Sequence, residues 1–255
     1  MGYKNLEELI EVIRILRSPE GCAWDREQTH KSLVKNIIEE AYETVDAIES
    51  GDKKHLCEEL GDVLLQVVLH AQIASENKDF DIEDIARNLK DKLIYRHPHV
   101  FGDTKVANTD EITANWELLK QKEKPHRISH MDGISKAQSA LMSAQKISKK
   151  AVKTGFEWPN EQALYDCISS EYQEFKEAKV NKDYQNMEEE LGDILFATVN
   201  LARWNNIDAE QALLKANKKF MTRFRKMEEL ATKSLEDYSF EEYDALWNSA
   251  KSALK

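Results

Sequence analysis

Apolar residues recur at helical spacing through most of the chain. Residues 33–49 carry one apolar stripe, which consists of Ile37, Ala41, Val45 and Ile48. Gly51 follows at a position that suits the first residue beyond a helix C-terminus. A second apolar helix is predicted from about His55 to Ala74. The short connection between the two predicts antiparallel neighbours, as in a helical bundle.

The same pattern occurs a second time. The segment EELGD stands at 58–62 and again at 189–193, and one shift of 131 residues aligns the sequence around both copies. A repeat of this length indicates a duplicated domain, because solenoid repeats have shorter periods. The second copy predicts helices at 163–180 and 186–204, and each copy continues into a third predicted helix, at 81–96 and 208–230.

We therefore predict an all-α protein of two tandem helical-bundle domains, residues 1–125 and 126–255. The chain has only 8 Gly and 4 Pro, and so few breakers favour long helices. The boundary is placed in the basic segment 120–133, which lacks an apolar period and is interpreted as a linker. Residues 97–99, His-Pro-His, are interpreted as a turn.

Composition narrows the choice of partners. A net charge of −11 argues against nucleic acid or an anionic membrane as the main partner, because both need a basic surface. The three cysteines form no Cys-x-x-Cys pair, which indicates reduced thiols in a cytoplasmic protein. The first ten residues lack a signal-peptide core, and the apolar run at 63–74 is too short to cross a bilayer.

Each copy places two acidic pairs at helical spacing of three. They are Glu40 with Glu43 and Glu59 with Asp62 in the first copy, and Glu171 with Glu174 and Glu190 with Asp193 in the second. A solvated acidic face is the ordinary explanation of a helical Glu-x-x-Glu, because glutamate is a good exposed helix former. The residues around the second pair of each copy, Glu59 with Asp62 and Glu190 with Asp193, argue against a solvated face.

The helix at 55–74 is predicted to be apolar nearly all round and hence buried. One narrow polar wedge remains, with apolar residues on both flanks, and it is formed by Glu59, Asp62, Gln66 and His70. In the second copy Ala197 and Leu201 leave only Glu190 and Asp193 in that wedge. Buried carboxylates need a positive partner, and these faces carry no Lys or Arg. An all-oxygen donor set predicts Mg²⁺, with Mn²⁺ as a substitute, and His70 is interpreted as a packed or hydrogen-bonded core residue.

Basic residues follow the acids in both copies. Lys219 and Arg223 lie four apart on the third helix of the second copy, and Lys92 and Arg96 have the same spacing in the first. Cations near a helix C-terminus often have no other role. Next to a metal-binding acidic cluster, however, they predict a polyphosphate site with hydrolysis by water, since no Walker loop is present. Trp247 either stacks on a base or anchors the last helix.

These segments resemble the MazG family. The resemblance is carried by EEAYE (39–43), EYQE (171–174), both EELGD segments and GCAWDREQTH (21–30), in which Ala23 replaces the family's proline. It implies an all-α nucleoside triphosphate pyrophosphohydrolase that forms a monophosphate and pyrophosphate with Mg²⁺ and works as a homodimer. The eight acids above match the family's metal ligands, and Lys219, Arg223 and Trp247 match its nucleotide-binding residues.

The two copies differ at one family position, where Glu39 in the first is Ser170 in the second. We expect the second copy to be catalytic, through Glu171, Glu174, Glu190 and Asp193, because its third helix is the more basic one. Two alternatives stay open: a narrower dUTP- or phosphoribosyl-ATP-type hydrolase, and a non-catalytic module stabilised by cations. The sequence leaves open the base and sugar preference, and whether water attacks the α- or β-phosphorus.

Overall fold

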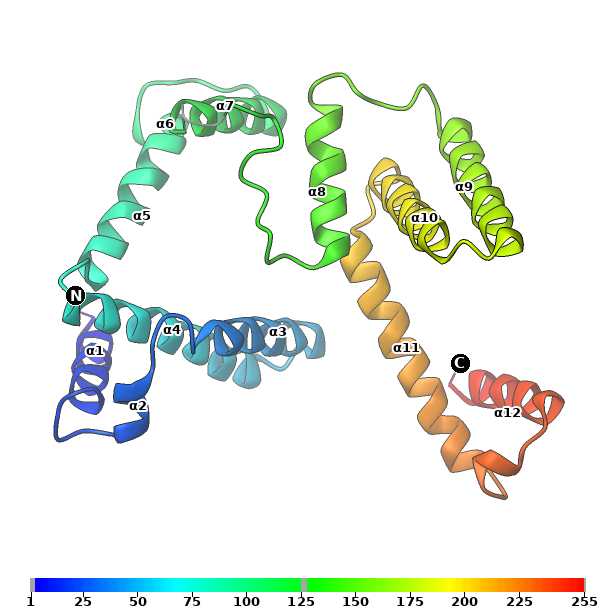
Figure 1. Cartoon of the computed structure of the whole chain (residues 1–255). Helices are drawn as coiled ribbons and strands as arrows, with labels where there is room; N and C mark the ends of the chain where they lie inside the picture. The colour runs from blue at the N-terminus through cyan, green and yellow to red at the C-terminus, as the bar shows by residue number, and fades with distance from the viewer. Residues whose placement is uncertain (1–2, 125–127, 255) are drawn as a thin grey trace. The chain divides into compact units, whose positions relative to one another are not determined.

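The computed structural model describes residues 3–124 and 128–254. Over these residues it contains twelve α-helices, one 3₁₀ turn and no strand, so the predicted all-α class is confirmed (Figure 1). The chain divides into two compact units, Met1–Glu123 and Lys124–Lys255. The predicted domain boundary between residues 125 and 126 lies outside the described residues.

The first unit contains seven helices within its described residues. They are α1 (Lys4–Leu16), α2 (Ala23–Glu27), α3 (Val34–Ser50), α4 (Lys53–Glu76), α5 (Ile82–Arg96), α6 (Pro98–Phe101) and α7 (Thr109–Lys122). Gly51 ends α3 in the left-handed region, with φ of 73°, as predicted. The Asp52 carboxylate then accepts hydrogen bonds from the backbone N–H of Lys54 and His55, so α4 begins two residues before the predicted start.

Two local predictions for this unit were wrong. The His-Pro-His turn contains the start of α6, because Pro98 is tolerated in the first turn of a helix. Residues 120–122, which were assigned to the linker, belong to α7.

The core of the first unit lies where α1 and the C-terminal half of α4 meet. Ile13, Leu33, Val68, Leu69 and Ile73 are buried there. The N-terminal half of α4 packs against α3 but keeps Leu60 52% and Leu64 38% exposed. The prediction that α4 is buried on nearly all sides is therefore wrong for its N-terminal half, because α1 packs only against the C-terminal half.

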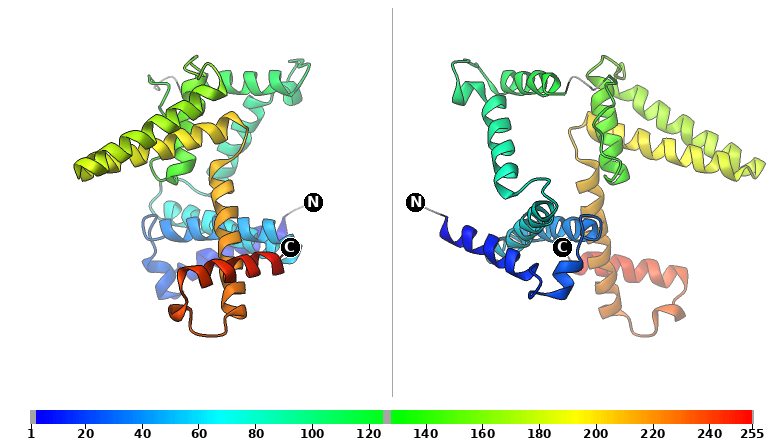
Figure 2. Two further views of the ribbon diagram at one scale, coloured as in Figure 1. Left: turned by 90° about the vertical axis from the view of Figure 1, so that its right-hand side faces the viewer. Right: turned by 60° about the vertical axis from the view of Figure 1, so that its left-hand side comes forward.

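The second unit repeats the helical hairpin. Its described helices are α8 (Ala140–Val152), α9 (Glu161–Asn181), α10 (Tyr184–Trp204), α11 (Ala209–Leu230) and α12 (Phe240–Ala253), with a 3₁₀ turn, η1 (Leu235–Asp237), before α12. Helices α9 and α10 run side by side in both views of Figure 2. Helix α8 packs on α10, and α11 contacts α8 and α12.

A polar network fixes the segment that precedes α9. Arg203 on α10 forms a two-pronged ion pair with Glu157 at 2.7 and 2.8 Å and donates to the Ser148 hydroxyl on α8 at 2.6 Å. Ser148 donates in turn to the Asn200 side chain at 2.5 Å. These contacts hold α8, α10 and the loop before α9 together. Among the described residues, no helix is both long and apolar enough to span a membrane.

Candidate metal and nucleotide site

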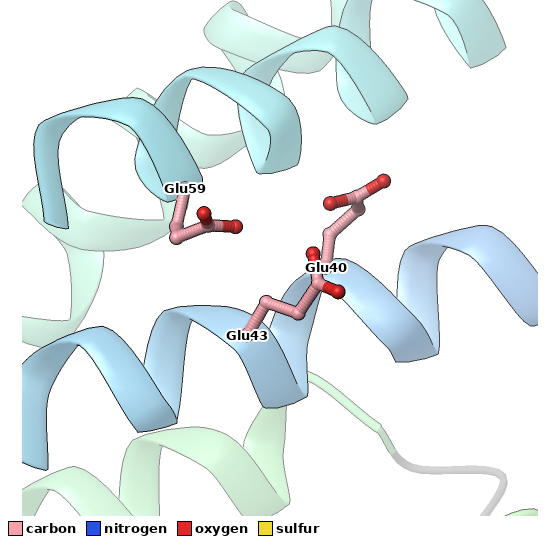
Figure 3. Close-up of side chains that lie close together, drawn as sticks. All are labelled: Glu40, Glu43 and Glu59. Carbon is pink, nitrogen blue, oxygen red and sulfur yellow. The ribbon is translucent and has the colours of Figure 1, made fainter. Parts of the chain in front are cut away.

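Three predicted acids converge between α3 and α4. Glu40 and Glu43 come from α3 and Glu59 from α4, and one carboxylate oxygen of each lies within 4.8 Å of the others. Figure 3 shows the three side chains directed toward the space between the two helices. Asp62, the fourth predicted ligand, is not part of this tight group. It still lies near enough for its charge to act on Glu40.

The first cluster contains excess negative charge. Desolvation, followed by the charges of Asp62, Glu43 and Glu59, raises the pKa of Glu40. Glu59 is buried, and its Oε1 lies 3.0 Å from Nε2 of His55. Its Oε2 is also buried and has no hydrogen-bond partner in the described part of the chain. A buried carboxylate oxygen that has no hydrogen-bond partner among the described residues and lies beside other carboxylates fits a cation ligand.

The second cluster has the same construction. Glu171 and Glu174 on α9 and Glu190 on α10 bring their oxygens within 4.8 Å of one another. Desolvation, followed by the charges of Glu174 and Glu171, raises the pKa of Glu190. Asp193 is exposed and outside the tight group, although its charge also contributes to that shift. In both units the Glu triplet converges and the Asp stands beside it.

Three contacts that neighbouring residues make with the clusters were not predicted from the sequence. His55 pairs with Glu59 in the first unit. In the second unit the Cys167 thiol donates to Glu171 at 3.5 Å, and the Ser170 hydroxyl donates to Glu174 at 3.0 Å. Each neighbour precedes its glutamate by four residues on the same helix, so the helical i,i+4 spacing could have identified all three.

The polar wedge on α4 extends beyond the acids. Gln66 is buried, and His70 is half-buried and hydrogen-bonded, as predicted for it. Its Nδ1 lies 2.7 Å from Nδ1 of His30, and the two rings stack with centroids 5.0 Å apart and 5° between their planes. Burial, and then the proximity of His30, lower the pKa of His70.

The predicted nucleotide-binding residues of the second unit lie on α11 and α12. The Arg223 guanidinium stands 5.8 Å from the centre of the Trp247 ring, and the Phe220 ring lies 5.3 Å from the same ring. An aromatic pocket opens here, and it is lined by Phe220, Phe224, Met227, Phe240, Tyr243, Asp244 and Trp247. Lys219 is exposed on α11, one turn before Arg223. The structure thus brings a cation and a flat ring together.

The corresponding basic pair of the first unit is arranged differently. Arg96 forms a two-pronged ion pair with Glu123, in which its Nε lies 2.9 Å from Oε1, and only 12% of its side chain is exposed. Lys92 is exposed on α5. Arg96 therefore stabilises the end of α7 in this structure, and nucleotide binding by this pair stays a prediction.

Comparison with known proteins places both clusters inside family matches. The MazG nucleotide pyrophosphohydrolase domain matches residues 28–101 and 160–227. These ranges contain all eight predicted acids together with Lys219 and Arg223, whereas Trp247 lies outside them.

Whole-chain relatives agree with the domain match. The chain is 48% identical over 249 residues to the nucleoside triphosphate pyrophosphohydrolase/pyrophosphatase MazG of Thermotoga maritima, covering 96% of this chain and 95% of that protein. It is 42% identical over 256 residues to the nucleoside triphosphate pyrophosphohydrolase of Escherichia coli K12, covering 96% and 97%. A crystal structure of a mazG-related protein from Thermotoga maritima matches 46% of this chain and 98% of its own, with 28% identity and a TM-score of 0.39.

Proposed function

The chain belongs to the MazG family of nucleotide pyrophosphohydrolases, and on that premise we propose that it hydrolyses nucleoside triphosphates to monophosphates and pyrophosphate with Mg²⁺. The observation that carries the proposal is the convergence of three carboxylates from two neighbouring helices, which occurs once in each family-matched segment. The substrates of the named relatives support a nucleoside triphosphate as the substrate class.

The residues present fit a divalent cation. The donor atoms of both triplets are carboxylate oxygens, which suit Mg²⁺ and, as a substitute, Mn²⁺. The buried Oε2 of Glu59 is available as a ligand, because it has no hydrogen-bond partner in the described part of the chain. Glu40, Glu43, Glu59 and Asp62 would hold the cation in the first unit, and Glu171, Glu174, Glu190 and Asp193 would hold it in the second.

A bound divalent cation supplies positive charge beside the phosphate oxygens and makes a nearby water more acidic. The proton of the attacking water then needs a carboxylate acceptor. In the second unit Ser170 replaces the first unit's Glu39, so this role falls to Glu174 or Glu189. We favour Glu174, because it belongs to the convergent triplet and Glu189 lies outside it.

The leaving pyrophosphate and the base need groups of their own. Lys219 and Arg223 provide the positive charge that stabilises the departing phosphate oxygens. Trp247 provides a ring on which a nucleobase can stack, and the Arg223 guanidinium lies next to that ring. The paired approach of Arg223 and Trp247 favours the second unit as the catalytic one.

We also propose that the chain forms a homodimer. The hairpin of the second unit exposes Leu191 48% and Leu195 54%, and the shift of 131 places them at the positions of Leu60 and Leu64. A leucine pair that is exposed at equivalent positions of both hairpins forms an apolar helix surface that no other described helix of its unit covers. A second copy of the chain would cover it by completing helical bundles.

Product analysis tests the proposed reaction. The purified chain is incubated with Mg²⁺ and a panel of ribo- and deoxynucleoside triphosphates in heavy-oxygen water, with a chelator as control. We expect monophosphate and pyrophosphate in equal amounts, and the labelled product identifies the phosphorus that water attacks. Diphosphate with orthophosphate, or no turnover of any nucleotide, would overturn the proposal. The second result would favour the non-catalytic cation-stabilised module.

A further inference from the structure

Three polar residues of α4 share one stripe of the helix. At about 100° per residue, Gln66 and His70 both lie within about 20° of Glu59 around the helix axis. The stripe runs about 16 Å from Glu59 to His70, at a rise of about 1.5 Å per residue. It therefore begins at the acidic cluster and leads away from it along a distance comparable to an extended nucleoside triphosphate.

Among the described residues, Gln66 in the middle of the stripe has no hydrogen-bond partner for its side-chain oxygen. The residue is 4% exposed, and its Oε1 is buried and unpartnered in the described part of the chain. Buried amide oxygens in folded proteins are nearly always hydrogen-bonded, so an exception is a candidate contact for a ligand that carries a hydrogen-bond donor.

The stacked histidines lie at the far end of the stripe. His70 packs its ring against that of His30, which belongs to the segment between α2 and α3. His30 is exposed, so its ring retains surface for another flat partner. Parallel rings near a buried acceptor that can receive a hydrogen bond are groups that can recognise a nucleobase.

The second unit shows that the fold does not require these polar residues. The shift of 131 places Ala197 at the position of Gln66 and Leu201 at the position of His70. Helix α10 forms and packs against α9 with these apolar residues in place. The polar stripe is therefore a property of the first unit alone, and folding does not explain it.

We propose that Gln66, His30 and His70 form a nucleoside subsite in the first unit. Oε1 of Gln66 accepts a hydrogen bond from a base N–H or a sugar hydroxyl, and the His30 ring stacks against the base. The phosphates of the same nucleotide lie at Glu40, Glu43 and Glu59, so this inference rests on the proposed function. The first unit then distinguishes nucleotides from inorganic polyphosphate through a contact that the second unit lacks.

Calorimetric titration of the full chain tests this subsite. Glu171→Gln and Glu174→Gln together remove two of the four proposed metal ligands of the second unit and leave the first unit intact. In Mg²⁺ this protein is titrated with a non-hydrolysable α,β-methylene nucleoside triphosphate and, separately, with inorganic tripolyphosphate. We expect Gln66→Leu to weaken binding of the nucleotide about tenfold, the effect of one lost hydrogen bond, and to leave tripolyphosphate unchanged.

Two controls separate recognition from folding. Gln72→Leu makes the same substitution on α4, about 220° around the axis from Glu59, and should change neither affinity. The unliganded Gln66→Leu protein should melt no lower than its parent, because the substitution removes a buried amide oxygen that has no hydrogen-bond partner within the described residues. His30→Ala should weaken binding of the nucleotide and leave binding of tripolyphosphate unchanged.

Equal affinity of the Gln66→Leu protein and its parent for the nucleotide would overturn the subsite, and so would parallel weakening of both ligands. Tripolyphosphate binding that persists in either case would leave the proposed phosphate site standing. If neither ligand binds in Mg²⁺, the first-unit phosphate site is wrong and the subsite falls with it.

Discussion

Glu59 and Gln66 lie two turns apart on the same face of α4, and within the described residues each keeps one buried side-chain oxygen without a hydrogen-bond partner. Such oxygens destabilise an unliganded protein, because each has given up its contact with water. Two of them on one stripe of α4 support the proposed cation and nucleoside ligands. The acid suits a cation and the amide suits a hydrogen-bond donor.

Removing one charge from the first cluster should stabilise the protein when no metal is present. Desolvation, followed by repulsion from the neighbouring carboxylates, raises the pKa of Glu40, and Glu40→Gln relieves both. In chelator we expect its free energy of unfolding to rise by less than about 1 kcal/mol, since the group is partly screened by solvent. Denaturant melts with and without Mg²⁺ measure this. Equal stabilisation of parent and variant by Mg²⁺ would contradict the metal assignment.

The stability of the metal-free protein should depend on pH through Glu190. Desolvation and neighbouring carboxylates raise the folded-state pKa of Glu190 above its unfolded value. The folded state then binds this proton more readily, so lowering the pH through the raised pKa favours folding. We expect the stability advantage of Glu190→Gln over the parent, measured in chelator, to shrink as the pH falls from neutral toward the ordinary glutamate range. An advantage that grows as the pH falls would show that folding lowers the pKa of Glu190.

Loss of the stacking ring on α12 should affect substrate binding. Trp247→Ala removes the ring beside Arg223, and base stacking on an aromatic side chain contributes about 1–3 kcal/mol. We expect KM for a nucleoside triphosphate to rise roughly tenfold. Trp116 on α7 is the residue that the shift of 131 aligns with Trp247, so Trp116→Ala serves as the matched control in the first unit and should leave KM unchanged. The reverse ranking of the two variants would assign catalysis to the first unit.

A charge on the exposed leucine surface should separate the proposed dimer. Leu64→Glu and Leu195→Glu each place a carboxylate where a second copy is expected to pack. Analytical ultracentrifugation should show a dimer for the parent and a monomer for the double variant. Val12→Glu, which alters another half-exposed apolar residue, on α1, should remain dimeric. A monomeric parent would refute the oligomeric proposal.

The sequence was a good guide to local structure and to the convergence of the glutamates. Helical periodicity located α3, α4 and the third helix of each unit, because apolar residues recur at helical spacing along each of them. The three-residue spacing on two helices was enough to predict that Glu40, Glu43 and Glu59 meet. Duplication provided a second, independent occurrence of both features.

What the sequence did not predict depends on tertiary packing. The exposure of Leu60 follows from where α1 ends on α4, and periodicity along one helix contains no such information. The ion pair between Arg96 and Glu123 joins residues on separate elements, so the spacing of Lys92 and Arg96 could not reveal it. The placement of Asp62 beside the triplet likewise depends on how α3 and α4 pack.

Pyrophosphate release in Mg²⁺ by the parent, Glu43→Ala, Glu174→Ala and the double variant tests the central claim most directly. If carboxylate clusters hold the catalytic cation, Glu174→Ala should lose at least about a hundredfold in kcat/KM, on the scale of a removed catalytic contact. The double variant should then be inactive while remaining folded by circular dichroism. Undiminished turnover in the folded double variant would contradict the account.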